Sequence, residues 1–357
     1  MMIKTGSSSA GHRSIESTLA LQRLFGWIES RFGGLPFDTG TSAAEIITSQ
    51  GRIQGDDLHR LLTHQATGLH VQGFYPPAAA RELGRQLARD FDLGKGRNWK
   101  VSTSRGLESS DVVTLGAHDP FNVASASGHP AEQDLYFKGV IRELDQRRIK
   151  KTKEEDKNYD SVDAEPQLWP LDLLRLQLDE AWPAGAGLAR EPKGRKRPFG
   201  GGLARVMKGP SRWKNGFIHV DEMGPLNPNQ GLFSANIYLQ LPDQAPAQEN
   251  STNVTDDNDK ENGQDMIHIW PVGIRNRWDW YRNALLLSGL SSQDVEAQLR
   301  LWKALGQPQT VRAAPGDLVL LCVQRPHAPV GFQSGTRVSL QCFIQHTGRD
   351  HRLLIDS

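Results

Sequence analysis

The sequence Asp317-Leu-Val-Leu-Leu-Cys-Val-Gln-Arg-Pro-His327, followed by Arg337-Val-Ser-Leu-Gln-Cys-Phe-Ile-Gln345, carries most of the information about the fold. Both apolar runs are short, and a glycine stands just before each of them. Short runs of β-branched, aromatic and leucine residues between turn residues are typical of β-strands. We therefore predict two successive strands, residues 317–323 and 337–345, with His327 in the connection between them.

Four runs upstream have the same character. They are residues 203–208, 216–221, 232–241 and 266–270. Several short strands in succession favour a sheet that closes on itself or packs against a second sheet. We expect an antiparallel barrel or sandwich over residues 201–345, interrupted by a helical insert at 277–305.

The chain before residue 201 has helical periodicity. Apolar residues recur at helical spacing over residues 15–32, 76–91 and 171–182, and prolines 76 and 77 are tolerated in a first helical turn. We expect residues 15–200 to be mainly helical, within a single domain that spans 15–357. By composition, residues 1–14 are expected to form a disordered tail, 145–167 a charged loop and 243–265 a mobile acidic loop.

Composition limits the class of protein. The chain has 357 residues, 42 basic and 41 acidic side chains and a formal net charge of +1, so no overall field would hold it on nucleic acid or an anionic membrane. The apolar runs are far too short to span a bilayer, and the N-terminus lacks the apolar region of a secretory signal. Cys322 and Cys342, the two cysteines, are expected to be small buried apolar residues in a reducing compartment, and we expect the cytoplasm.

The triplet His219-Val-Asp221 is a candidate metal site. Residues two apart in a strand project from the same face, so this imidazole and carboxylate could hold one ion between them. Alone the signal is weak, because 11 histidines and 41 acidic residues in 357 positions give about one such triplet by chance. On the triplet alone, an ordinary surface or core histidine is the better explanation.

His327 and Arg337 add a second spacing, ten residues apart. Taken with the triplet and the order of the strands, they resemble the iron(II)/2-oxoglutarate-dependent dioxygenases. That family has a double-stranded β-helix, a jelly-roll or cupin-like core with flanking helices (class α+β), which carries a His-x-Asp and a distal His, with an Arg about ten residues later. The resemblance covers residues 202–345 and, more faintly, the helix that starts at residue 76.

The resemblance implies a ligand set and a cosubstrate. His219, Asp221 and His327 would bind Fe(II), and three positions on the metal would stay open for 2-oxoglutarate and dioxygen. Arg337 would pair with the distal carboxylate of 2-oxoglutarate, and Ser339 on the same strand face would add a hydroxyl donor. An ordinary strand arginine in a surface ion pair is the alternative for Arg337.

The expected activity is oxidation of an unactivated C–H bond of a small molecule, with release of succinate and carbon dioxide. In the halogenating branch of the family a small residue replaces the carboxylate ligand. Asp221 is present here, which favours hydroxylation, desaturation or oxidative cyclisation, in amino-acid or natural-product metabolism. His327 follows His219 by 108 positions, a stretch that includes the acidic loop and the helical insert, and excursions of that length often form lids.

Further pocket residues follow from strand phase. Asn236 and Tyr238 share a polar face and could contact 2-oxoglutarate or substrate, although a solvated face is an equal alternative. Phe217 is in phase with His219 and could form a wall of the site. Substrate contact is a weaker expectation than packing for three other residues: Arg205, His268 and Trp270.

Two other functions remain open. Basic runs at residues 147–151 and 193–197 would suit a dioxygenase that modifies nucleic acid, but no aromatic residues are interleaved for base stacking. A cupin-like metal protein could use the same ligands without 2-oxoglutarate, although Arg337 and Ser339 favour a diacid. A small-molecule substrate is the leading expectation.

Overall fold

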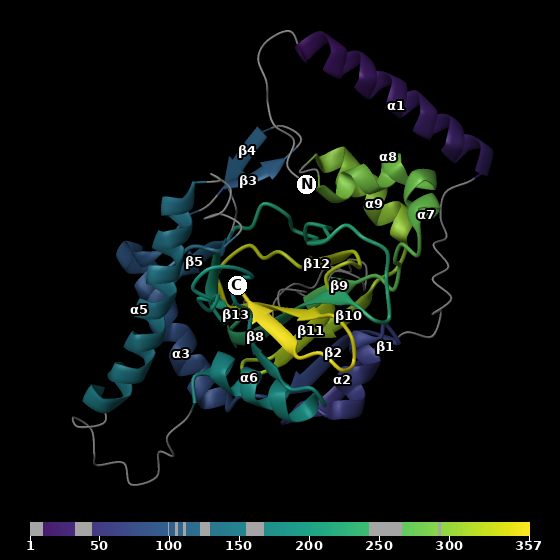
Figure 1. Ribbon diagram of the computed structural model, residues 1–357. Coiled ribbons are helices and arrows are strands. Elements are labelled where there is room, and N and C mark those ends of the chain that lie inside the picture. Colours follow the sequence, from purple (N-terminus) through teal and green to yellow (C-terminus); the bar gives the residue numbers. More distant parts are fainter. Residues whose placement is uncertain are drawn as a thin grey trace, which may run out of the picture.

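The computed structural model describes residues 10–32, 45–98, 100–103, 106–109, 112–121, 129–154, 168–242, 266–291 and 294–357. The fold is mixed α+β, with one large sheet, one small sheet and helices around them (Figure 1). No helix among these residues is long and apolar enough to cross a membrane.

The large sheet has nine strands, in the order β1-β2-β11-β8-β13-β14-β6, with β7 between β13 and β5. Strand β13 is the central element: β8 pairs along one edge, while β7 and then β14 pair along the other. The strand bounds are β1 Glu45–Gln50, β2 Ala66–Gln72, β5 Val113–Leu115, β6 Ala186–Leu188, β7 Leu203–Lys208, β8 Gly231–Gln240, β11 Leu318–Cys322, β13 Thr336–His346 and β14 Leu353–Asp356.

The small sheet has three antiparallel strands, β10-β9-β12. Their bounds are β9 Met266–Ile269, β10 Gln309–Arg312 and β12 His327–Pro329. Strands β3 (Lys100–Thr103) and β4 (Gly106–Ser109) form a separate antiparallel pair.

Helices cover the outer face of the large sheet. Alternate residues of β8, β11 and β13, among them Ile237, Leu320 and Leu340, are fully buried there against α2, α3 and α6. The opposite face packs its apolar part against the small sheet, with Val319 and Ile269 fully buried between the two. Helix bounds are α2 Gly55–Leu62, α3 Pro77–Asp90, α5 Pro130–Glu154 and α6 Pro170–Ala181, and the short π-helical turn Phe91–Lys95 follows α3.

The helical insert expected at 277–305 consists of α7 (Arg277–Arg282), α8 (Ala284–Leu287), the 3-10 turn Ser288–Ser291 and α9 (Val295–Leu305). Helix α1 (Ala10–Phe32) lies beside it (Figure 1), and Phe25 stacks on Tyr281 at a centroid distance of 6.2 Å. Helix α1 includes residues 10–14 of the expected tail, and residues 1–9 lie outside the described chain.

The structure differs from the sequence expectations in three further places. Residues 145–154 of the expected charged loop form the end of α5, and 155–167 lie outside the described residues, as does the acidic segment 243–265. The segment before residue 201 is less helical than expected, because β1, β2, β5 and β6 join the large sheet. Residues 216–221 do not form a strand; they make one isolated β-bridge, between His219 and His327.

Candidate active site

A cavity of about 100 Å³ lies between the two sheets. One face of β7, β13, β8 and β11 forms its floor, and the register aligns Arg205 with Ser339 and Ser339 with Tyr238. The alternation of the strands therefore brings polar side chains from three neighbouring strands onto one surface. The lining includes Arg205, Met207, Ser234, Asn236, Tyr238, Leu321, Arg337, Ser339 and Gln341.

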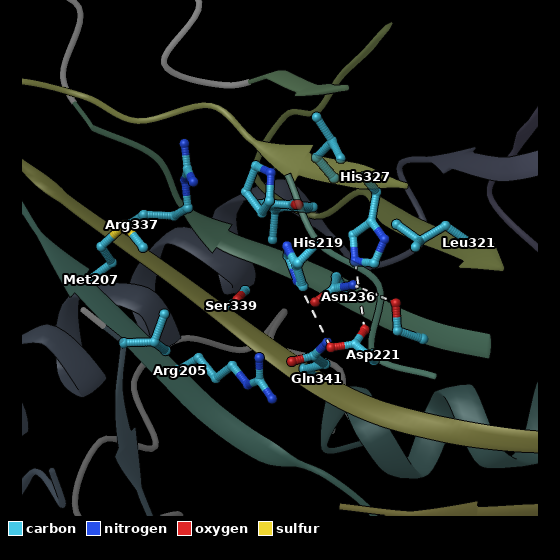
Figure 2. A pocket seen from close by; sticks show the side chains of 15 residues that line it. Arg205, Met207, His219, Asp221, Asn236, Leu321, His327, Arg337, Ser339 and Gln341 are labelled. Atoms are coloured by element: carbon cyan, nitrogen blue, oxygen red, sulfur yellow. Dashed lines mark hydrogen bonds and ion pairs between the residues drawn. The ribbon is translucent and has the colours of Figure 1, made fainter. Parts of the chain in front are cut away.

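The opposite side of the cavity carries His219, Asp221 and His327 (Figure 2). One potential ligand atom from each of the three lies within 4.8 Å of the others. Nε2 of His219 is 3.8 Å from Oδ1 of Asp221, and Nε2 of His327 is 3.5 Å from Oδ2. The three side chains therefore converge on one point.

Backbone contacts fix this convergence. His219 and His327 exchange two backbone hydrogen bonds of 3.0 Å, and the Asp221 amide donates to the Val323 carbonyl. The Nδ1 atoms of the two imidazoles lie 2.9 Å from carbonyl oxygens, those of Phe217 and Arg325 respectively. A ring that donates from Nδ1 leaves the Nε2 lone pair free, which is the form that binds a metal ion.

The charge states also suit metal ligation. Burial, with His327 close by, lowers the pKa of His219 to about 4, so the ring is neutral at neutral pH. Burial alone would raise the pKa of Asp221, but at the low pH where this carboxyl titrates the His327 and His219 rings are protonated, and they and Arg205 lower its pKa to about 2. A neutral imidazole and an ionised carboxylate are the ligand forms that a divalent cation requires.

A buried glutamine on the helical insert supports the first ligand. Gln298, in α9, accepts a 2.8 Å hydrogen bond from the Ile218 amide and donates a 3.0 Å bond to the Ile218 carbonyl. Its side chain thereby satisfies the backbone of the residue next to His219. Sequence reasoning missed this residue, since a glutamine 80 positions away carries no local signal.

Arg337 lies at another end of the cavity, 8% exposed. Its Nη2 donates a 2.6 Å hydrogen bond to the Val330 carbonyl, and its guanidinium lies 4.9 Å from the centre of the Phe332 ring. Burial raises the pKa of the nearby Tyr238 to about 12, although Arg337 lowers it, so the phenol stays a hydrogen-bond donor.

Most of the residues expected from the sequence meet at this cavity, and three do not line it. Phe217 stacks on the His219 ring at 5.5 Å and supports it from behind. His268 lines a different surface pocket, beside Thr310. Trp270 is fully buried and donates to the Gly306 carbonyl, so its role is packing. His268 and Trp270 therefore do not line this cavity, and the packing alternative holds for Trp270; Ile267, on the cavity face of β9, lines it instead. Sequence reasoning also missed Gln341, which follows Ser339 in phase.

Comparison with known proteins gives only distant likenesses. No family model matches the sequence, and no curated protein matches it. Solved structures with similar folds include an N-substituted L-amino acid dioxygenase from Burkholderia ambifaria (12% identity, 73% of this chain and 100% of that chain, TM-score 0.37). A second is the non-heme alpha-ketoglutarate-dependent carbocyclase SnoK from nogalamycin biosynthesis (13% identity, 84% of this chain and 90% of that chain, TM-score 0.37). A third is a Pseudomonas putida prolyl-4-hydroxylase (14% identity, 82% of this chain and 96% of that chain, TM-score 0.31). These TM-scores are low, so the functional assignment rests on the cavity.

Proposed function

We propose that this protein is an iron(II)- and 2-oxoglutarate-dependent oxygenase of a small molecule, built on a double-stranded β-helix formed by its two facing sheets. The observation that carries the proposal is the convergence of His219, Asp221 and His327, with both Nδ1 atoms held by carbonyls, opposite a floor that contains Arg337. Two imidazoles and one carboxylate that leave one side of the metal open are diagnostic of non-haem iron oxygenases.

The residues fit the metal. His219 and His327 would bind it through Nε2, and Asp221 would bind through a carboxylate oxygen. Iron held there, with 2-oxoglutarate and dioxygen, supplies the oxidation of an unactivated C–H bond coupled to the formation of succinate and carbon dioxide. The contribution of the chain itself is to place the substrate and to limit the entry of water.

The floor fits a diacid cosubstrate. Arg337 would pair with the distal carboxylate, and the hydroxyls of Ser339 and Tyr238 would donate to the same group. Tyr238 can do so because its raised pKa keeps the proton on the phenol. Asn236, whose Nδ2 donates to Ser234 at 3.3 Å, lies on the same floor and would border the chelating end.

The test is an anaerobic titration of the purified protein with Fe(II) and then 2-oxoglutarate. The proposal predicts a visible metal-to-ligand charge-transfer band that saturates with the cosubstrate, as chelated iron(II) gives. Zn(II) in place of Fe(II) is the control and should give no band. Binding of Fe(II) with no response to 2-oxoglutarate would favour the cupin-like alternative.

A further inference from the structure

The cavity has a second cationic group that the proposed cosubstrate does not use. Arg205 lies on β7, where it pairs with Ser339 of β13 and with Thr114 of β5. Its side chain runs along the floor towards Asp221 and Gln341, away from Arg337 (Figure 2). Arg205 and Arg337 therefore line different parts of the same cavity.

Within the described chain, the side chain of Arg205 has no hydrogen bond or ion pair, and its Nε is buried. The Oε1 atom of Gln341 is likewise buried with no hydrogen-bond partner among these residues. Buried polar groups in folded proteins nearly always have partners, and a buried guanidinium without one is costly. Burial lowers the pKa of Arg205, an effect that the charge of Asp221 opposes. The fold therefore keeps an incompletely satisfied cation beside the metal ligands.

Arg337 differs in how its guanidinium is held: its Nη2 donates to the Val330 carbonyl and it lies against the Phe332 ring, although its Nε, like that of Arg205, is buried without a hydrogen bond to any described residue. It acts electrostatically on Tyr238, whereas Arg205 acts on Asp221 and His219. One arginine is thus fixed at the end of the cavity with the hydroxyl donors. Arg205, by contrast, faces the metal ligands and the side-chain amide of Gln341.

Charge balance supports a separate role for Arg205. With iron(II) and doubly ionised 2-oxoglutarate bound, as the proposed function requires, the charges of Asp221, Arg205 and Arg337 leave one positive charge uncompensated in a buried cavity. A substrate with one negative charge would neutralise it. A planar carboxylate matches the guanidinium fork in two parallel hydrogen bonds.

On these grounds, and resting on the proposed function, we propose that Arg205 binds a carboxylate of the substrate, so that the substrate class is organic monoacids; the Oε1 atom of Gln341, an acceptor, would be left for a donor group of the same substrate. Arg205 is then a specificity-determining residue. The acid group would be held next to Asp221, which places the rest of the substrate over the open side of the metal.

The first experiment uses acetate and acetamide as probes, because they have nearly the same shape and differ in charge. The protein is loaded with Mn(II), saturated with 2-oxoglutarate, and titrated while the relaxation of the probe's methyl protons is measured. We expect saturable relaxation enhancement with acetate and at least tenfold weaker binding of acetamide. Absence of saturable acetate binding overturns the proposal.

Three variants locate the bound acid. Arg205→Gln should weaken acetate binding about tenfold to a hundredfold, and Arg205→Lys should fall between it and the wild type. Lys208→Gln is the matched control, since it removes a positive charge from an exposed position of the same strand and should leave acetate binding unchanged. Equal acetate affinity in Arg205→Gln and wild type overturns the proposal, since acetate would then bind elsewhere, for example on the metal.

The 2-oxoglutarate affinity of each variant distinguishes failure of the proposed function from failure of the substrate-binding role of Arg205. If Arg205→Gln loses 2-oxoglutarate rather than acetate, Arg205 is the cosubstrate anchor and the substrate inference fails alone. If the wild type does not bind 2-oxoglutarate, the proposed function fails and takes the inference with it. Succinate formation should be stimulated by monocarboxylic acids and not by the corresponding primary amides. An amide that stimulates succinate formation as strongly as its acid would overturn the inference.

Discussion

The floor of the cavity and the segment that carries His219 are held by different interactions. The floor belongs to a continuous ladder, in which β13 pairs with β7 on one edge and β8 on the other. Residues 217–221 have no such ladder: the β-bridge between His219 and His327, the hydrogen bond from the Asp221 amide to the Val323 carbonyl and the side chain of Gln298 hold them. The floor is therefore determined by local strand patterning, whereas the position of the first ligand depends on a contact with a distant helix.

The largest loss of metal affinity and activity is expected from substitution of Asp221, which lies where the two regions meet. Asp221→Ala leaves two imidazoles, and we expect metal affinity to fall roughly a hundredfold or more, with loss of substrate-dependent succinate formation. Calorimetric titration with Ni(II) or anaerobic Fe(II) measures the affinity. The unfolding midpoint of the metal-free variant should stay near that of the wild type, because the apolar core lies on the other side of the large sheet.

An Asp221→Ala variant with wild-type affinity would remove Asp221 from the ligand set. Asp221→Glu is the useful companion variant, because it keeps the carboxylate and displaces it by one methylene. It should retain part of the metal affinity if the carboxylate is a ligand.

The second effect tests the floor alone. Arg337→Ala should weaken 2-oxoglutarate binding by roughly tenfold to a hundredfold, and Arg337→Lys by less, because lysine keeps the charge and loses the planar fork. Metal affinity should not change in either variant, since Arg337 is not a ligand. Titration of the charge-transfer band measures both. If the Arg337 variants lose metal affinity by the same factor as 2-oxoglutarate affinity, the substitution at the cavity floor also disturbs the metal ligands, and the two regions are structurally coupled.

The same difference explains what the sequence could predict. Strands β7, β8 and β13 alternate, so residue phase grouped Asn236 with Tyr238 and Arg337 with Ser339. Phase did not decide whether the polar face of β8 meets a cavity or solvent, and it favoured packing over substrate contact for Arg205. The grouping of His219, Asp221 and His327 was expected only through the resemblance to the dioxygenase family, because strand phase could not supply it: the first two do not lie in a strand. Strands β1 and β2 were missed because their short apolar runs, residues 45–50 and 66–72, alternate with polar and small residues and stand among helical segments. Gln298 could not be found, since its contact depends on the fold of the insert.

The third effect tests the ligand segment. Gln298→Leu removes both hydrogen bonds to the Ile218 backbone and leaves a buried N–H and C=O unsatisfied. We expect the free energy of unfolding to fall by about 1–3 kcal/mol and metal affinity to fall several-fold, with 2-oxoglutarate affinity in the metal-loaded protein nearly unchanged. Leu299→Gln, at a neighbouring position that is 62% exposed, is the control and should change neither quantity.

A stability loss without any change in metal affinity would show that Gln298 supports the insert and does not position His219. Gln298→Glu refines this outcome. It keeps the acceptor for the Ile218 amide but turns a carboxyl oxygen towards the Ile218 and Gly289 carbonyls, so the loss of stability should be at least that of Gln298→Leu while the carboxyl is ionised and should become smaller at low pH, where the protonated group can donate.

The smallest effect concerns the other ligand-bearing segment, the one that leads to His327. His64 is 5% exposed, its Nε2 lies 3.1 Å from the Asn227 carbonyl, and Arg325 lies close by. Burial, reinforced by the charge of Arg325, lowers the pKa of His64 to about 4, below its ordinary value of 6.5. The unfolded chain therefore binds more protons than the folded protein, and the stabilising contribution of neutral His64 is complete above pH 6.5 and is lost as the pH falls towards 4.

For this histidine alone, linkage gives a loss of roughly half a kcal/mol between pH 7 and pH 6. His64→Asn isolates that contribution, because asparagine tolerates the positive φ of 62° at this position and does not titrate. Urea unfolding of both proteins at the two pH values gives the difference, and the other titrating groups cancel in the comparison. If the two proteins lose the same free energy, the pKa of His64 is the same in the folded and unfolded states and its burial makes no pH-dependent contribution to stability. A larger loss in the wild type, of the stated size and sign, would show that the folded protein keeps His64 neutral beside Arg325, in the segment that leads to His327.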